Sequence, residues 1–188
     1  MARWEPGADD RLREAALTLF LERGYEQTTV TEIAHRAGVT ARTYFRHFAD
    51  KREVLFSGAE GVSVGMAEAV ADAPADATPI TVVGLALDAA AEAIGGRWAF
   101  YRKRQVLIDA NAELQERQLV KLAGLAVVLA DGLRERGVSD PEARLVAESA
   151  ITVLRVGFDR WVAAGSPDLA STLRQVLEEL LGLSLDPS

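Results

Sequence analysis

The sequence predicts an all-α protein of about nine helices, with an N-terminal three-helix helix-turn-helix domain followed by a larger helical domain. Two observations predict this fold class. Apolar residues recur at the three- and four-residue spacing of helices, and no stretch alternates as a strand would. Of the 188 residues, 49% are hydrophobic and alanine and leucine are abundant, which is typical of a compact helical protein.

Composition argues against several classes of site and location. The chain has no cysteine and only two histidines, His35 and His47, so we expect no disulfide, no metal centre and no cofactor. It has neither a glycine-rich phosphate loop nor a nucleophile elbow, so we expect no enzyme activity. No long apolar run free of charge is present, and the segment MARWEPGADD lacks the apolar core of a signal peptide. We therefore expect a cytoplasmic protein that does not enter a membrane.

The first expected helix lies between Asp9 and Gly24. Asp9 is a suitable N-cap, and Gly24 suits the position just after the last turn. The apolar face of this helix consists of Leu12, Ala15, Ala16, Leu19 and Phe20.

A second, short helix is expected from Val30. Thr29 and Glu32 have the spacing of a capping box, in which each side chain accepts a backbone hydrogen bond from the other residue. Gly38 should end this helix. Its inner face consists of Ile33, Ala34 and Ala37, with Val39 as an apolar residue after the turn.

Thr40 can cap a third helix. We expect most of the apolar surface of this helix, formed by Tyr44, Phe45 and Phe48, to be buried. Asp50 then opens a further capping box with the acidic residue three positions later. A long fourth helix is therefore expected from Lys51 to about residue 70.

Positive charge gathers around the third helix. The net charge of −7 lies entirely in residues 57–188, because residues 1–56 are neutral. Within the neutral part Asp50 is the only acid among five cations: Arg36, Arg42, Arg46, Lys51 and Arg52. This patch is either a footprint for a polyanion or a solvated helix surface.

Two short helices joined by a glycine-containing turn form a helix-turn-helix, whose second helix enters the major groove of DNA. Arg42 lies in the first turn of that helix and can bind guanine, while Arg46 and His47 are placed to reach phosphates. Hydroxyls and cations in the opening turns of the second and fourth helices suit phosphates too. The expected DNA contacts are Thr29, Thr31, Thr40, Arg42, Thr43, Arg46, His47 and Lys51.

The segment TTVTEIAHRAGVTARTYFRHFADKREVL, preceded by Arg23-Gly24-Tyr25, resembles the DNA-binding region of TetR-type transcriptional regulators over residues 10–56. The resemblance implies a DNA-binding domain over residues 1–56 and a ligand-binding and dimerisation domain over residues 57–188. It also implies a ligand-responsive homodimer that binds double-stranded operator DNA, most often as a repressor.

Three positions depart from the pattern of this family. Many relatives have glycine or alanine where Arg42 stands, so Arg42 implies an added contact to a base or a phosphate. Many have tyrosine where Phe45 stands, and its hydroxyl binds a phosphate, which Phe45 cannot do. Tyr44 points about 100° away around the helix, so it is a doubtful substitute. Ala49 replaces a typical proline, which should matter little.

Beyond the linker Ala73–Pro79 we expect five more helices. They are expected at about residues 80–96, 97–109, 113–136, 141–164 and 166–181, with Asp140 capping the fourth of them and Gly165 ending it.

The last two helices carry an unusual amount of apolar surface. The first of the pair has two apolar faces, and Gly157 on one of them would allow a close approach of another helix. The other has a single stripe formed by Leu169, Leu173, Val176, Leu177, Leu180 and Leu181. We therefore expect these helices to hold a homodimer, the alternative being that both faces are filled within one chain.

A small, largely apolar ligand is expected between the helices of residues 80–165, because regulation requires a signal-binding site. The candidates are Trp98, Phe100, Tyr101, Arg102, Leu107, Asn111, Arg155, Phe158 and Trp161. Two alternatives stay open. The second domain could have a filled core, and it could bind a protein partner or nothing.

Overall fold

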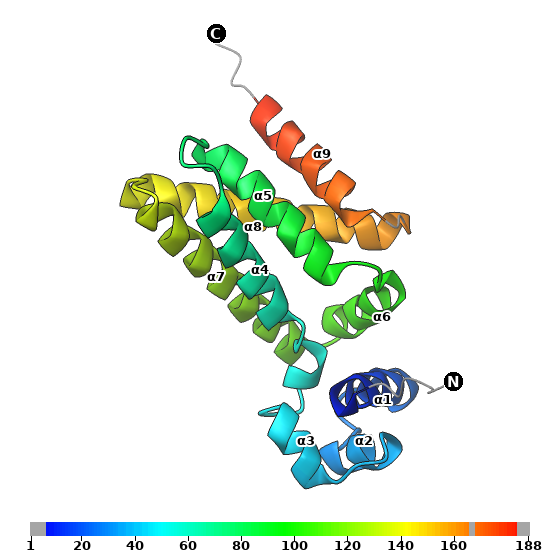
Figure 1. The fold of residues 1–188 in the computed structure, drawn as a ribbon. Helices are drawn as coiled ribbons and strands as arrows, with labels where there is room; N and C mark the ends of the chain where they lie inside the picture. Colours follow the sequence, from blue (N-terminus) through cyan, green and yellow to red (C-terminus); the bar gives the residue numbers. More distant parts are fainter. Residues whose placement is uncertain (1–6, 166–167, 184–188) are drawn as a thin grey trace, which may run out of the picture. The chain divides into compact units, whose positions relative to one another are not determined.

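The computed structural model describes residues 7–165 and 168–183 of the chain. Within these ranges it contains nine α-helices, one 3-10 turn and no strand, which confirms the all-α fold class (Figure 1). No single helix in the described ranges is long and apolar enough to cross a membrane.

The chain divides into two compact units. The N-terminal unit consists of Met1–Ser57 with Phe100–Gln118. The C-terminal unit consists of Gly58–Ala99 with Leu119–Ser188. A segment from the middle of the sequence therefore belongs to the same unit as the first helices.

The N-terminal unit contains α1 (Ala8–Arg23), α2 (Val30–Arg36), α3 (Ala41–His47) and the 3-10 turn η1 (Glu53–Leu55). The predicted inner faces of α1 and α2 are buried in one hydrophobic core, and residues from α6 (Trp98–Asp109) complete it. Because this core joins all three short helices, it fixes the position of α3 within the unit.

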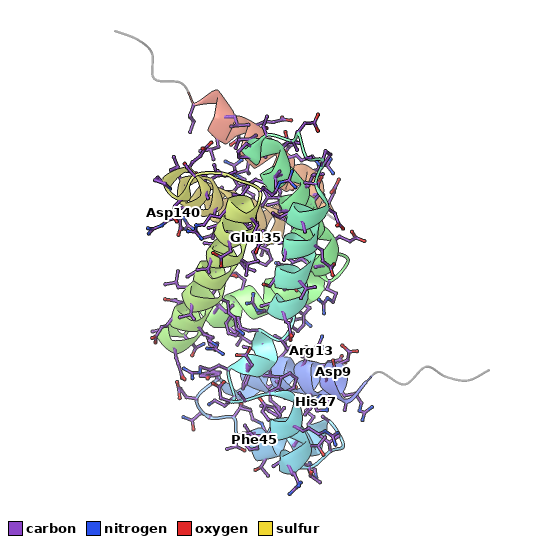
Figure 2. The ribbon with its side chains drawn as sticks, turned by 60° about the vertical axis from the view of Figure 1, so that its left-hand side comes forward. Asp9, Arg13, Phe45, His47, Glu135 and Asp140 are labelled. Carbon is purple, nitrogen blue, oxygen red and sulfur yellow. The ribbon has the colours of Figure 1, made fainter. Side chains whose placement is uncertain are left out.

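The start of α1 differs from the expectation. Gly7 is the N-cap, while Asp9 lies inside the first turn, where its carboxylate accepts a hydrogen bond from Arg13 (Figure 2). An acidic side chain there is favourable because the helix N-terminus carries a partial positive charge.

The expected long helix from Lys51 is wrong. The chain makes the short turn η1, and α4 (Ala59–Asp72) begins only at Ala59. Val54, Leu55 and Phe56 are all buried in the core of the N-terminal unit. Successive residues of an α-helix point about 100° apart, so one helix face could not bury all three.

The C-terminal unit is built around α5 (Pro79–Ile94), which packs against α4, α8 (Asp140–Ala164) and α9 (Leu169–Gly182). The long α7 (Ala112–Glu135) contributes its later turns to this unit (Figure 1). Ser139, not Asp140, is the N-cap of α8. Asp140 instead pairs with Arg134 across the connection from α7, at 2.7 Å.

Both apolar faces of α8 are largely filled by its own chain. Ala147, Ile151 and Phe158 on one face are buried, and so are Val153 and Leu154 on the other. The two-faced pattern of α8 is therefore explained within one chain and does not by itself indicate a second subunit.

The close approach expected at Gly157 also takes place inside the chain. A Cβ atom at Gly157 would lie 2.5 Å from Cδ2 of Leu173 on α9. The stripe of α9 is buried at Leu169, Leu173 and Val176, and Leu177 is half-buried near Gly84 of α5. The expected start of this helix at residues 166 and 167 lies outside the described residues.

Candidate nucleic-acid interface

The turn between α2 and α3 has a defined backbone geometry. Gly38 adopts a left-handed conformation with φ of 72°. The N–H of Val39 donates to Ala34 O at 2.9 Å, and the N–H of Gly38 donates to His35 O at 3.1 Å. This pair of hydrogen bonds is a Schellman motif, in which glycine avoids the steric cost of a left-handed residue. The motif directs the chain from α2 into α3.

Threonine side chains fix the start of both helices. Oγ1 of Thr29 accepts from the N–H of Glu32, and the Glu32 carboxylate accepts from the N–H of Thr29, which confirms the predicted capping box. Oγ1 of Thr40 accepts from the N–H of Thr43, and the two hydroxyls of that pair lie 3.1 Å apart. Their hydroxyls therefore already have partners within the chain, while Thr31 is exposed on α2.

Tyr44 and Phe48 anchor α3 in the core. Tyr44 has no exposed surface, and its hydroxyl donates to the carbonyl oxygens of Asp50 and Lys51 at 3.2 and 3.4 Å. Burial raises the pKa of this hydroxyl well above its usual value. The hydroxyl of Tyr44 is therefore used inside the unit, and it does not replace the phosphate-binding hydroxyl that a tyrosine at position 45 would supply.

Phe45 lies on the outside of α3, contrary to the expectation that it would be buried. Its side chain is 57% exposed, and it points away from the core in Figure 2. Arg42, Arg46 and His47 are exposed on the same short helix. Within the described residues Arg42 and Arg46 form no ion pair, so their charges are available to an external anion.

The basic patch is narrower than the sequence indicated. Arg36 pairs with Glu22 on α1 at 2.7 Å. Arg52 pairs with Asp50 at 2.9 Å and with Glu113 at 3.3 Å. These two cations are therefore balanced within the N-terminal unit, and the free positive charge is concentrated on α3.

Lys51 does not lie in the first turn of a helix. Its Nζ donates to Tyr25 O at 2.9 Å and sits 4.1 Å from the centre of the Tyr25 ring. The basis for the predicted phosphate contact, a free helix N-terminus, is therefore absent at Lys51.

Arg104 holds the segment after α3 in place, a role that the sequence did not indicate. Its Nε donates to Leu55 O at 2.8 Å, and its guanidinium lies 4.6 Å from the centre of the Phe56 ring. Only 8% of Arg104 is exposed, and burial lowers its pKa to about 10, against an opposite effect of Tyr101. A nearby pair, Arg117 with Glu53, makes a second connection to η1. An arginine inside a cluster of exposed cations gives no sequence signal for such burial.

The residues predicted to bind a ligand are divided between the two units. Leu107 and Tyr101 are buried in the N-terminal unit, where Phe100 packs on the core and Asn111 donates to Leu107 O. Arg102 is exposed there. In the C-terminal unit Trp98 and Phe158 both contact Trp161, and Arg155 is exposed. The aromatic candidates therefore form two groups: the rings of Phe100 and Tyr101 are 5.4 Å apart in the N-terminal unit, and Trp98, Phe158 and Trp161 lie together in the C-terminal unit.

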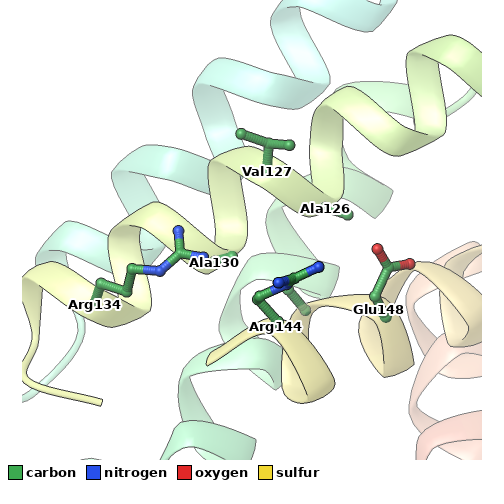
Figure 3. Close-up of a pocket in the computed structure, with 7 residues that line it drawn as sticks. Ala126, Val127, Ala130, Arg134, Arg144 and Glu148 are labelled. Atoms are coloured by element: carbon green, nitrogen blue, oxygen red, sulfur yellow. The ribbon is translucent and has the colours of Figure 1, made fainter. Parts of the chain in front are cut away.

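Two pockets formed by described residues of the C-terminal unit bear on the predicted ligand site. One, of about 310 Å³, lies between α5, the end of α8 and the start of α9, and Trp161 lines it together with Asp88, Ala91, Glu92, Gly95, Asp168, Leu169, Ala170 and Arg174. The other, of about 160 Å³, lies between α7 and α8 (Figure 3). It is lined by alanines, Val127, Arg134, Arg144 and Glu148, none of which the sequence singled out. Trp161 is thus the one predicted ligand residue that lines either cavity.

Comparison with known proteins gives two family matches. Residues 12–57 match the family described as bacterial regulatory proteins, tetR family. Residues 77–183, more than half of the chain, match the family described as MftR C-terminal domain.

Two characterised relatives match the N-terminal part of the chain. The HTH-type transcriptional regulator TcmR of Streptomyces glaucescens is 40% identical over 88 residues, which cover 47% of this chain and 37% of TcmR. The HTH-type transcriptional repressor BepR of Brucella suis is 51% identical over 43 residues, which cover 23% of this chain and 21% of BepR. The matched part is therefore well under half of either relative.

Solved structures share the fold over nearly the whole chain. A complex of SmeT with triclosan has a TM-score of 0.63 at 19% identity and covers 96% of each chain. FadR of Bacillus subtilis in complex with stearoyl-CoA has a TM-score of 0.59 at 22% identity and covers 94% of this chain and 99% of FadR. FadR of Thermus thermophilus in complex with lauroyl-CoA has a TM-score of 0.57 at 24% identity, with 96% and 97% covered.

Proposed function

The chain belongs to the tetR family of bacterial regulatory proteins, and we propose that it is a sequence-specific DNA-binding transcriptional regulator. We propose further that it is a repressor that a small molecule releases from its operator, and that it acts in the cytoplasm without catalytic activity. The exposed surface of α3 carries this proposal.

That surface has the properties required of a DNA-reading helix. A Schellman turn and a threonine cap fix the position of α3, and the buried side chains of Tyr44 and Phe48 anchor it in the core. Its outer side presents Arg42 and Arg46 without internal partners. Guanidinium groups bind phosphates and the major-groove edge of guanine. A recognition helix should keep such groups free, as α3 does.

The proposed contacts fall into two classes. Arg42 in the first turn is the proposed base-reading residue, and Arg46 and His47 are the proposed phosphate contacts. Thr29 and Thr40 cap α2 and α3, and the Thr43 hydroxyl lies 3.1 Å from that of Thr40, so we give these three residues a positioning role. Only one hydroxyl proton is used between Thr40 and Thr43, so the other can be donated to a phosphate. Thr31 and Lys51 would contribute to phosphate binding only at the edge of the site.

The proposed assembly is a homodimer that engages two half-sites. The faces of α8 that are buried pack within their own chain, so they give no evidence for a dimer. The proposal that α8 and α9 form the dimer interface therefore rests on the apolar residues that remain exposed on these two helices. Leu145 on α8 is 69% exposed and Leu181 on α9 is 55% exposed. A two-fold dimer presents two recognition helices to one near-palindromic site.

For the ligand we propose the cavity between α5 and α9 that Trp161 lines. The relatives solved with stearoyl-CoA, lauroyl-CoA and triclosan share the fold, which supports a small organic effector but does not define its chemistry. A second domain that binds a protein partner, or no ligand, is the alternative. The ligand proposal predicts that a small molecule changes the affinity for DNA, and the alternative predicts that none does.

Selection of duplexes from a randomised library by the purified chain tests DNA binding. We expect one near-palindromic sequence to be enriched. If each subunit of a dimer places the guanidinium of Arg46 on a phosphate, log K should fall with log salt at a slope of about −2. Arg46→Ala should flatten this slope, whereas Arg144→Ala on α8, a control exposed cation, should not. Failure to enrich any sequence would refute the proposed function.

Release of the selected duplex by stearoyl-CoA, lauroyl-CoA, triclosan and a broader metabolite panel tests the ligand proposal. A compound that acts through the α5–α9 cavity should lose its effect on the Ala170→Phe variant, because Ala170 is a half-buried residue of the cavity wall. DNA binding without ligand should persist in that variant. If the variant responds like the original chain, the effector site lies elsewhere, and if no compound acts, the alternative is favoured.

A further inference from the structure

Phe45 is an exposed aromatic side chain in the centre of the proposed reading surface. It is 57% exposed although its neighbours Tyr44 and Phe48 are buried. Arg42 lies three residues before Phe45, so these two side chains are neighbours on the surface of α3, and Arg46, the next residue in the chain, is exposed on the same short helix. An aromatic ring at this place is hydrated in the free protein and becomes covered when the helix binds a surface.

The ring of Phe45 is also held in position. It packs edge-on against the ring of Tyr44, with centroids 5.6 Å apart and planes at 80°. Tyr44 is itself fixed by burial and by the hydrogen bonds of its hydroxyl to Asp50 and Lys51. Phe45 is therefore a supported apolar projection, which loses little conformational freedom on binding.

The chemistry of DNA limits what such a group can recognise. A phenyl ring cannot donate a hydrogen bond to a phosphate, and an anion gains nothing from its apolar surface. In the major groove the principal apolar group on a base edge is the C5-methyl of thymine. We propose that Phe45 is a specificity-determining residue that reads thymine by covering this methyl group, next to the position read by Arg42. The inference rests on the proposed DNA-binding function.

Deoxyuridine lacks only the C5-methyl of thymidine, so it isolates the proposed contact. The probe is the duplex that the original chain selects, with each thymine of one half-site replaced singly by deoxyuridine. For the original chain we expect one replacement to weaken binding about fourfold, the value for one buried methyl group. For Phe45→Ala the same replacement should have no effect, because the partner of the methyl is gone. Phe45→Leu, which keeps an apolar side chain, should retain part of the response.

Two controls show whether the methyl contact is independent of Arg42 and whether Phe45→Ala leaves the fold unchanged. Arg42→Ala should still lose affinity on the deoxyuridine replacement, because the methyl contact does not involve its guanidinium. Thermal unfolding of Phe45→Ala should match the original chain, because the ring is mostly outside the core.

The inference is overturned if every deoxyuridine duplex affects the original chain and Phe45→Ala equally. That result would mean that Phe45 contacts deoxyribose or does not contact the DNA. If Phe45→Ala then binds every duplex sequence more weakly than the original chain by the same factor, the contact is with deoxyribose. If the original chain selects no duplex at all, the proposed function fails before Phe45 is tested.

Discussion

Substitution of Gly157 by alanine should destabilise the C-terminal unit, although alanine is a better helix former than glycine. Gly157 lies inside α8, and its added Cβ would meet Cδ2 of Leu173 at 2.5 Å and Cα of Leu173 at 3.5 Å. Leu173 has no exposed surface, so it cannot move away without displacing other core atoms. Overpacking of this kind costs about 1–3 kcal/mol, against a gain of about 1 kcal/mol from helix propensity. The expected net effect is a loss of about 0–2 kcal/mol.

Gly124→Ala is the matched control for this prediction. Gly124 also lies inside a helix, α7, but it is exposed and no heavy atom lies within 4 Å of the added Cβ. This variant should be about 1 kcal/mol more stable than the original chain. The difference between the two variants removes the propensity effect and isolates the steric effect, which should lie at about 1–3 kcal/mol or about 2–12 °C in unfolding midpoint for a chain of this size.

The assay is thermal unfolding followed by circular dichroism at several protein concentrations. The steric loss occurs between α8 and α9 of one chain, so the difference between the variants should not depend on concentration. Equal midpoints for Gly157→Ala and Gly124→Ala would refute the packing argument. If the midpoint of Gly157→Ala instead falls further below that of Gly124→Ala as the protein is diluted, Gly157 lies at an interface between subunits.

Four further outcomes are expected. Arg42→Ala should relax base preference at one position and cost about 1–3 kcal/mol in binding, so an unchanged sequence preference in a randomised selection would show that Arg42 reads no base. Burial of the Asp50 carboxyl tends to raise its pKa, but hydrogen bonds from Arg52 and the backbone outweigh this effect and lower it. The ionised carboxylate therefore stabilises the folded chain fully above the unfolded pKa, and this contribution is lost as pH falls through the lower folded pKa. Asp50→Asn should make acid unfolding less steep below about pH 4. The double variant Leu145→Arg, Leu181→Arg should be monomeric by light scattering with an intact fold, and a dimeric mass would place the interface on other helices. Arg104→Met should destabilise the N-terminal unit by about 1–3 kcal/mol in denaturant unfolding, since it leaves a buried carbonyl without a donor, and unchanged stability would show that relief of the buried charge compensates.

Local signals in the sequence predicted the helix-turn-helix well. The capping box of Thr29 and Glu32, the cap at Thr40 and the glycine at position 38 each depend on neighbours within a few residues, and each occurs in the structure. Such interactions need no knowledge of the tertiary fold, because both partners are close in the chain.

Interactions between distant segments were not predictable in the same way. The exposure of Phe45 depends on which side of α3 meets the core, and the two adjacent aromatic residues are equivalent in the sequence. The pairing of Arg36 with Glu22 spans two helices, and that of Arg52 with Glu113 joins segments far apart in the sequence. Leu107 was assigned to a ligand pocket because helix 97–109 was read as part of the second domain, whereas its packing places it in the core of the first.

The distribution of these ion pairs changes the expected basis of DNA binding. The sequence offered five cations around α3, and the structure neutralises Arg36 and Arg52 and turns Lys51 onto a carbonyl. With few free charges, the sequence-independent attraction to phosphates is weaker, because it scales with the number of phosphates neutralised. A larger share of the affinity must then come from contacts that differ between base sequences. Arg42 and Phe45, one polar and one apolar, are the exposed side chains of α3 that we propose for that role. Under the proposed function, the small number of free charges and the exposed ring both favour discrimination between base sequences.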